Sequence, residues 1–178
     1  MGCTAVDEVE PVTRDEVAGV IVARVLHREG GIAQLEGESW VTRFGQTPAW
    51  LQQFGLPAPR TVGEAIANYR TWLVRTRLIG LCDQPDSLAD GTIDFAVHSG
   101  HQIAIRGLQR ALGIAVDGIL GPETQAAIDR CDRALMGRRI VADRLRFLGR
   151  LITQAPQQNA KWAAGWCARV ADQIEALA

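Results

Sequence analysis

Residues 14–31, RDEVAGVIVARVLHREGG, predict a helix that ends in an acidic residue and two glycines. Apolar residues from Val17 to Val25 recur at helical spacing, and Gly30-Gly31 stops the helix. Glu29 therefore falls at the helix C-terminus, where backbone carbonyl oxygens disfavour a negative charge. An acid that keeps its proton can donate it, so Glu29 is our candidate general acid. The alternative is a solvated glutamate before an ordinary glycine stop.

The remaining sequence predicts a mainly helical fold with one small β-hairpin. Thr13 and Glu16 form a capping box at the start of the first helix. Residues 32–47 lack a helical period and contain Trp, Val, Thr and Phe, so we expect an irregular hairpin beside Glu29. Trp162 and Trp166 are expected to anchor the last helix to the core. Further helices are expected over residues 48–55, 62–78, 87–98, 101–130 (two helices with a turn between them), 138–153 and 159–177.

Composition limits the kinds of partner. The 178 residues suit one domain, or one domain with a small appended lobe, and 47% of them are hydrophobic. A net charge of −1 gives no electrostatic reason to expect a nucleic acid. No apolar run approaches the roughly 18 residues of a membrane span, and the acidic N-terminal segment does not form a signal peptide. The dispersed cysteines and histidines lack the spacing of metal ligands, so we expect neither a metal nor a cofactor.

Three further motifs carry a family resemblance. They are DFAVHSG over residues 94–100, LQRALGIAVDGILGPET over residues 108–124 and GWCARV over residues 165–170. Together with the Glu-Gly-Gly that begins at Glu29, they resemble glycoside hydrolase family 108, the lysozyme-like phage endolysins. The resemblance spans about residues 20–175. The second motif is also similar to small peptidoglycan-binding modules, and a simple pair of structural helices is the alternative for it.

The resemblance implies a lysozyme-like fold and a cleft in which Glu29 has a carboxylate partner. The family's Thr-x-x-Gly-x-Thr pattern matches residues 42–47, which places Thr42 at the cleft, where it would help to position water. The turn before it departs from the family, because it is about one residue shorter. Glu38, or else Glu36, could stand where the family keeps an aspartate, and Glu36 is also a candidate for substrate binding. Both are otherwise ordinary surface residues.

Three more residues are candidates for contacts with the glycan. Tyr69 falls on one face of the predicted 62–78 helix, where it either edges a sugar groove or belongs to the core. Asp94 and His98 are one helical turn apart and share a face. The family has asparagine at the position of His98, and histidine keeps a hydrogen-bonding group there while it adds the ability to carry charge. A structural histidine is the alternative.

The function that the resemblance implies is hydrolysis of the peptidoglycan strand between N-acetylmuramic acid and N-acetylglucosamine, a muramidase activity. Glu29 would protonate the leaving oxygen, and the second glutamate would orient water or stabilise an oxocarbenium-like transition state. If no second carboxylate reaches the cleft, a lytic transglycosylase is the better interpretation. A protein of another class, an inactive wall-binding structural component of a phage particle, also fits the sequence.

The chain is expected to contain a flexible arm and two lobes. Residues 1–12 form the arm, residues 13–100 a lysozyme-like catalytic lobe, and residues 101–178 a helical, peptidoglycan-binding-like lobe packed with it as one globular unit. Bacterial peptidoglycan is the expected partner, without a nucleic acid or a membrane span. The protein is expected to be made in the cytoplasm without a signal peptide. It would act in the periplasm, in the cell wall or within a phage particle. It would reach the wall as part of such a particle or by a holin-dependent route.

Overall fold

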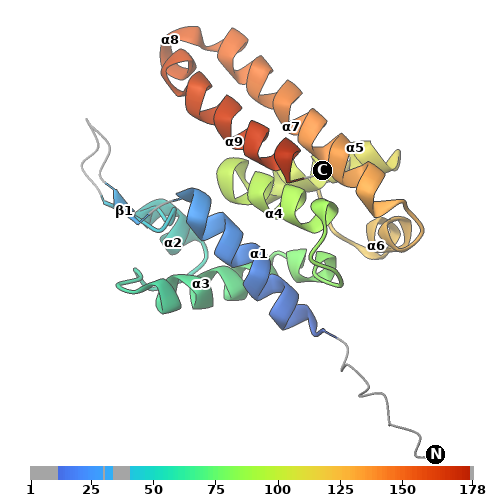
Figure 1. Ribbon diagram of the computed structural model, residues 1–178, viewed down its shortest axis with the longest axis horizontal. Helices are drawn as coiled ribbons and strands as arrows, with labels where there is room; N and C mark the ends of the chain where they lie inside the picture. The colour runs from blue at the N-terminus through green and yellow to red at the C-terminus, as the bar shows by residue number, and fades with distance from the viewer. Residues whose placement is uncertain (1–11, 30, 34–40, 177–178) are drawn as a thin grey trace, which may run out of the picture.

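A computed structural model describes residues 12–29, 31–33 and 41–176 of the chain (Figure 1). Its elements in chain order are α1 (Arg14–Glu29), β1 (Ile32–Ala33), β2 (Thr42–Arg43), α2 (Pro48–Gln53), α3 (Val62–Arg75), η1 (Leu78–Leu81), α4 (Ser87–Ser99), α5 (His101–Leu112), α6 (Pro122–Asp129), α7 (Arg133–Gln154), α8 (Pro156–Asn159), η2 (Ala160–Trp162) and α9 (Ala163–Glu175). The predicted mainly helical, lysozyme-like fold with a small hairpin is confirmed. The arm expected over residues 1–12 lies almost wholly outside the described residues.

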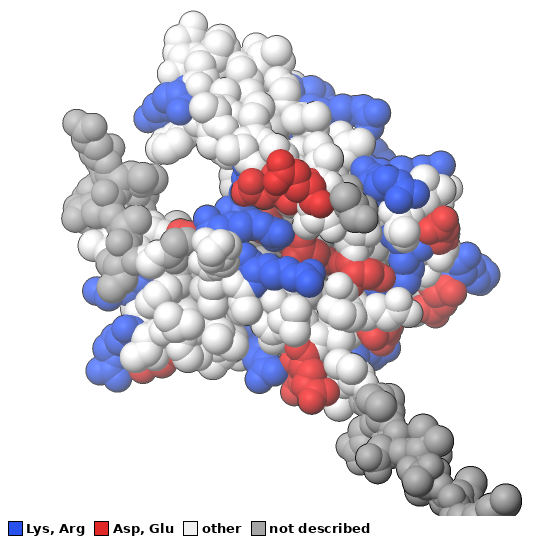
Figure 2. All heavy atoms as spheres, viewed as in Figure 1, with Lys and Arg blue, Asp and Glu red and all other residues white. Residues whose placement is uncertain are grey.

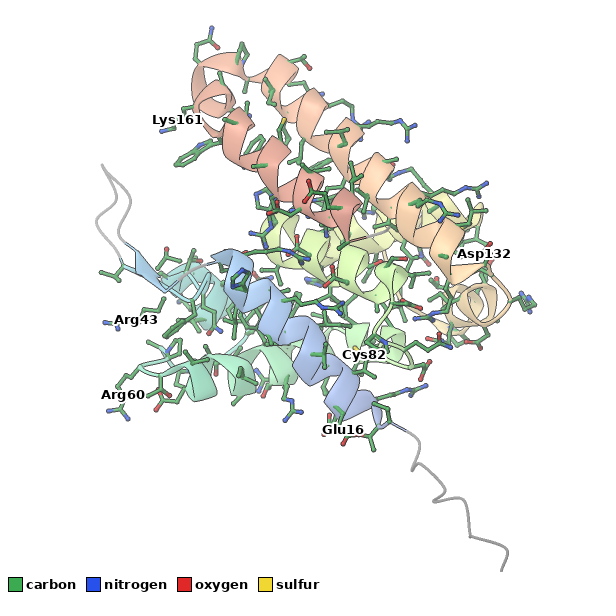
Figure 3. All side chains as sticks on the ribbon, in the orientation of Figure 1. Glu16, Arg43, Arg60, Cys82, Asp132 and Lys161 are labelled. Carbon is green, nitrogen blue, oxygen red and sulfur yellow. The ribbon has the colours of Figure 1, made fainter. Side chains whose placement is uncertain are left out.

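The capping box predicted at the start of α1 is confirmed. The Glu16 N–H donates to Thr13 Oγ1 at 3.3 Å, and the Thr13 N–H donates to Glu16 Oε2 at 2.8 Å. Figure 3 labels Glu16 at this end of the helix, far from the hairpin that follows the other end. Val17 and Val25 are buried with the apolar stripe between them. This stripe fixes how α1 lies on the core, and α1 ends at Glu29 as the sequence predicts.

The predicted hairpin is also confirmed, and it is tied to α3. Ala33 pairs with Thr42 in antiparallel register. After the second strand, the Gln46 side chain is buried and donates to the Ala65 carbonyl at 3.0 Å. Asn68 Nδ2 in turn donates to Gln46 Oε1 at 2.8 Å. Side-chain hydrogen bonds from α3 therefore hold a strand pair that is too short to be stable alone.

Helix α4 runs through the centre of the molecule. In Figure 1 it lies between α1 and α3 on one side and α7 and α9 on the other. Every residue from Leu88 to Ala96 in this helix is buried. One cluster of buried apolar side chains extends from Val22 of α1 to Ile140 of α7. The lobes expected over residues 13–100 and 101–178 therefore share a hydrophobic core.

The last helices depart from the expectation at two points. Helix α7 begins at Arg133 instead of residue 138, because Asp132 caps it by accepting from the Leu135 N–H at 3.0 Å. Trp166 packs against the small apolar cluster between α7 and α9, but Trp162 is 37% exposed. The prediction that Trp162 anchors the last helix is wrong, because α8 and η2 carry the turn between α7 and α9 beyond the core (Figure 1). Within the described part of the chain, no helix has both the length and the apolar character needed to cross a membrane.

Candidate functional site

Glu29 lies where the end of α1, the hairpin and α9 meet. Its Oε1 is 2.6 Å from Nη2 of Arg169 on α9, and its side chain keeps 17% of its surface exposed. Gly45, which follows the hairpin, packs directly on it. A Cβ at Gly45 would lie 2.7 Å from both Cγ and Oε2 of Glu29, closer than real Cβ contacts allow. The Glu29 carboxylate is thus confined on two sides and partly open to solvent.

A hollow in the surface borders this position. Figure 2 shows the outline of the molecule notched between the C-terminal end of α1 and the end that carries α8 and the start of α9. Basic and acidic side chains meet in the middle of the same face. Helix α1, whose last residue is Glu29, therefore ends beside this hollow.

Asp94 lies behind Glu29 and organises the charged groups around it. Its side chain is fully buried and accepts from Arg169 Nε at 2.9 Å, Arg169 Nη2 at 2.8 Å, Arg144 Nη1 at 2.5 Å and Arg28 Nη1 at 3.2 Å. Burial alone raises the pKa of Asp94. The hydrogen bond from Arg169 and the charges of Arg169, Arg144 and Arg28 outweigh burial and hold that pKa well below its usual range. Asp94 is therefore a carboxylate that keeps Arg169 in place.

The buried charges around Asp94 are balanced. Arg28 also pairs with Asp90 at 3.1 Å, so three arginines (28, 144 and 169) face three carboxylates (29, 90 and 94). Buried charges are tolerated when they are paired in this way, and removal of one partner is costly. The network joins α1, α4, α7 and α9, and Glu29 is its member at the C-terminal end of α1.

Arg169 was not among the candidates from the sequence. The signal for it was present, because Arg169 is the arginine of the GWCARV motif at residues 165–170. The motif contributes to the family resemblance, and within it only Trp166 was predicted to have a structural role. Arg169 lies 140 positions beyond Glu29 in the chain, and no periodic pattern relates two residues so far apart. The structure adds it to the site as the cation that contacts Glu29.

His98 is half-buried and points toward α9. Its ring packs edge-on against the Trp166 ring, with 5.8 Å between centroids, and its Nδ1 is 3.1 Å from Ser99 Oγ. Burial, together with the positive charges of Arg144 and Arg169, lowers the pKa of His98 to about 4. The imidazole is therefore neutral near pH 7 and offers a hydrogen-bonding group without charge. This is the property that it would share with the asparagine of the resembling family.

The structure encloses two of the candidates for contacts with the glycan. Tyr69 is 1% exposed, and its hydroxyl donates to the Phe44 carbonyl at 3.0 Å. It therefore supports the hairpin at the residue that follows the second strand. Burial of the ring, and the nearby charge of Glu29, raise the pKa of Tyr69 above its usual value. Asp94 is equally enclosed. In this conformation neither side chain presents a surface to a ligand, and both act by holding other parts of the site.

The remaining candidates stay predictions. Thr42 is half-buried in the second strand, paired with Ala33, and its part in positioning water is untested. Glu36 and Glu38, the candidates for the second acid, lie outside the described residues. Gly45, the glycine of the 42–47 pattern, has a role that the structure explains. Its φ of +76° and its contact with Glu29 both require a residue without a side chain.

In the LQRALGIAVDGILGPET motif, the buried side-chain amide of Gln109 holds the turn together. Gln109 is 1% exposed, and its Nε2 donates to Asp117 Oδ1 at 2.6 Å, the Ile119 carbonyl at 3.0 Å and Thr124 Oγ1 at 3.1 Å. The Gly118 N–H donates back to Gln109 Oε1 at 2.8 Å. Gln109 thus fixes the turn between α5 and α6, and it offers no surface for a ligand.

Comparisons with known proteins place these features in context. A family model described as "Predicted Peptidoglycan domain" matches residues 103–171. Among solved structures, the chain is similar to "Structure of Brucella abortus SagA", with 25% sequence identity and a TM-score of 0.73. That likeness covers 90% of this chain and 92% of the other. No curated protein matches the sequence. The narrower resemblance to glycoside hydrolase family 108 stays a prediction.

Proposed function

We propose that the protein binds bacterial peptidoglycan and cleaves its glycan strand as a muramidase, with Glu29 as the general acid. The observation that carries this proposal is the partly exposed Glu29 carboxylate, confined by Arg169 and Gly45 at the end of α1. The matched peptidoglycan domain model supports a role at the cell wall, and the likeness to SagA supports the fold. The domain model agrees with the substrate that the sequence motifs imply.

The chemistry requires Glu29 to carry a proton to the oxygen of the leaving sugar. Arg169 occupies Oε1, so we assign that proton to Oε2. A guanidinium next to a carboxylate opposes protonation, but Arg169 also donates two hydrogen bonds to Asp94. Asp94 offsets much of its positive charge. The guanidinium can therefore orient Glu29 while its effect on the charge of Glu29 is reduced.

A second group must stabilise the positive charge that develops on the sugar ring or activate water. We propose Glu38, or else Glu36, for this part, with Thr42 positioning the water. Without such a carboxylate, the muramyl 6-hydroxyl can attack instead, and the protein is a lytic transglycosylase. In either case we propose that the protein reaches the wall within a phage particle or by a holin-dependent route.

One observation favours a second function, that of a wall-binding structural component without catalysis. The 2.6 Å contact between Glu29 and Arg169 is an ion pair when Glu29 is charged, and a charged carboxylate has no proton to donate. The family-model match covers residues 103–171 and does not include Glu29. A protein that only binds peptidoglycan would satisfy both facts.

Digestion of purified peptidoglycan separates these functions. The wild type should release fragments with reducing N-acetylmuramic acid ends, and Glu29→Gln should lower the rate about 100-fold or more, since an amide cannot donate the proton. Glu175→Gln, the same change at an exposed position at the end of α9 and outside the matched residues 103–171, is the matched control and should have wild-type activity. Anhydro-muramic products would identify a lytic transglycosylase. Sedimentation with the wall without any release by the wild type would identify a binding component and reject the hydrolase.

A further inference from the structure

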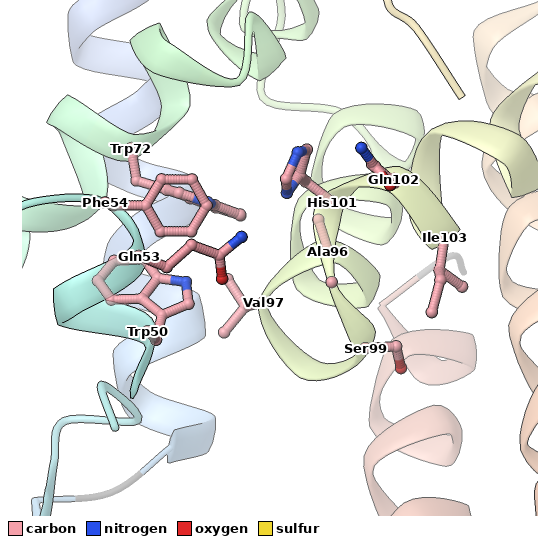
Figure 4. A pocket seen from close by; sticks show the side chains of 11 residues that line it. Trp50, Gln53, Phe54, Trp72, Ala96, Val97, Ser99, His101, Gln102 and Ile103 are labelled. Carbon is pink, nitrogen blue, oxygen red and sulfur yellow. The ribbon is translucent and has the colours of Figure 1, made fainter. Parts of the chain in front are cut away.

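A cavity of about 300 Å³ opens between α2 and the corner where α4 meets α5 (Figure 4). Trp50, Phe54 and Trp72 form one wall, and Val97, His101 and Ile103 line the other. The cavity lies on a different side of α4 from the contact between His98 and Trp166, since the neighbouring Val97 faces it.

The aromatic wall is rigid. The Trp50 ring lies 5.4 Å from the Phe54 ring and 5.9 Å from the Trp72 ring, measured between centroids. Thr47 caps α2 by accepting from the Trp50 N–H at 3.2 Å, which fixes the helix that carries Trp50 and is followed directly by Phe54. Flat aromatic faces in fixed positions bind the apolar C–H face of a sugar ring or a methyl group with little loss of entropy.

Trp72 supplies a hydrogen-bond donor without an acceptor. Its side chain is 1% exposed, and among the described residues its Nε1 has no hydrogen-bond partner. Figure 4 shows the indole of Trp72 extending past Phe54 toward the cavity. A buried N–H without an acceptor is unfavourable, and most buried polar groups in proteins are paired. An acceptor on a ligand in this cavity would satisfy it.

The cavity is lined by uncharged side chains. Gln53, Ser99 and Gln102 are its polar members beside His101, and no carboxylate, lysine or arginine is among the described residues that line it. Burial lowers the pKa of His101, which favours a neutral ring. This lining suits a neutral ligand that combines an apolar group with amide or hydroxyl groups.

Both walls are continuous with the elements that hold Glu29. On one wall, the Trp50 ring packs on Tyr69 at 5.5 Å, and Tyr69 supports the Phe44 carbonyl next to Gly45. On the other wall, Val97 follows Asp94 by three residues, about 4.5 Å of helix rise. The same elements of the fold therefore position both the cavity and Glu29.

We propose that the cavity binds an N-acetylated hexosamine of the glycan strand and recognises its acetamido group. The methyl group packs against Trp50 and Phe54, and the acetamido carbonyl accepts from Trp72 Nε1. This assignment rests on the proposed action on peptidoglycan for the identity of the polymer. Binding, however, does not require Glu29 to act as an acid, so the two proposals can fail separately.

The test uses the full chain labelled with ¹⁵N, whose five tryptophans each give one indole N–H signal in NMR spectra. The signal of Trp72 is the one lost in Trp72→Phe. The probe is N,N′-diacetylchitobiose, and cellobiose, which has hydroxyls in place of the acetamido groups, is its control. We expect diacetylchitobiose to shift the Trp72 signal and cellobiose to leave it in place. Trp72→Phe should raise the dissociation constant about 5- to 10-fold, the effect of one lost hydrogen bond.

Trp162→Phe makes the same substitution at an exposed tryptophan outside the cavity and should bind like the wild type. If Trp72→Phe does not fold, Val97→Phe fills the cavity from the opposite wall and should abolish binding. An unmoved Trp72 signal at saturation, equal binding of cellobiose, or unchanged affinity in the folded variants overturns the proposal. Digestion of the wall by the wild type is measured separately, so lysis with no binding here rejects this cavity and leaves the muramidase intact.

Discussion

Arg169 Nη2 lies 2.6 Å from Glu29 Oε1 and thereby joins the last helix of the protein to the end of the first. The same guanidinium donates two hydrogen bonds to the buried Asp94. Glu29 and Asp94 thus share one cation, and the position of the first carboxylate depends on the second. Arg169 is in this arrangement a positioning residue for the proposed acid.

Replacement of Arg169 tests that role. Arg169→Lys keeps the charge but cannot make the forked contact with Asp94, so we expect activity on peptidoglycan to fall about 10-fold. Arg169→Ala removes both the contact with Glu29 and the forked contact with Asp94, so activity should fall further than in Arg169→Lys. Circular dichroism checks that each variant folds, and wild-type activity in a folded Arg169→Ala would contradict the positioning role.

Asp94→Asn should destabilise the fold by about 3–5 kcal/mol, because Arg28, Arg144 and Arg169 lose a buried countercharge. The pKa of Asp94 is lowered in the folded protein, so its contribution to stability is fully present above the unfolded value of about 4 and is lost as the pH falls below it. Urea unfolding between pH 2 and 7 measures this. The wild type should lose stability below about pH 4 more steeply than Asp94→Asn, and parallel curves would contradict the charged state assigned to Asp94.

Gly45→Ala and Gly55→Ala form a matched pair. Both glycines have positive φ, +76° and +57°, so both substitutions should cost about 1 kcal/mol of backbone strain. At Gly45 the new Cβ also meets the Glu29 side chain at 2.7 Å, whereas at Gly55 the nearest atom is Arg75 Nη1 at 3.8 Å. Activity should therefore fall at least about 10-fold more in Gly45→Ala, since a small displacement of an acid greatly slows proton transfer. If both variants fold and have equal activity, Glu29 does not take part in catalysis.

His98→Asn tests whether the imidazole acts without charge. With a pKa of about 4, His98 is neutral from about pH 5 upward. We expect the asparagine variant to keep activity within about three-fold and to leave the pH–rate profile between pH 5 and 8 unchanged. The pKa of a free histidine is higher, so folding releases protons from this group. The part of the stability that depends on His98 is present above about pH 6.5 and declines toward pH 4. A profile that changes near pH 6 to 7 in the variant would show that a charged His98 contributes to the reaction.

Local patterns in the sequence predict most of the fold. The end of α1 at Glu29, its capping box and the hairpin follow from helical periodicity, side-chain caps and β-branched or aromatic residues, all of which act between near neighbours. The same patterns do not predict that the side chains of Tyr69 and Asp94 are enclosed. Spacing puts Asp94 and His98 on one face of α4, but it does not reveal that arginines from three other helices surround Asp94.

The candidate site is less predictable because its contacts are distant in sequence. Asp94 meets residues 50 and 75 positions further along the chain, and the motif that contains Arg169 showed its tryptophan more clearly than its arginine. Burial also changed the meaning of a motif. Gln109 is a polar residue of the motif, and polar residues usually lie at the surface. In the structure it is buried, and its amide holds the turn between α5 and α6.

Arg144 and Arg169 lie inside the matched residues 103–171, whereas Asp94 and Glu29 lie outside them. A fragment limited to the matched residues would carry both arginines without these countercharges and would expose the apolar sides of α5 and α7 that pack on the shared core. Recombination that moved this half alone into another protein would therefore separate charges that are stable only together. The unit that can be inherited or transplanted intact must include α1 and α4, which makes it nearly the whole chain.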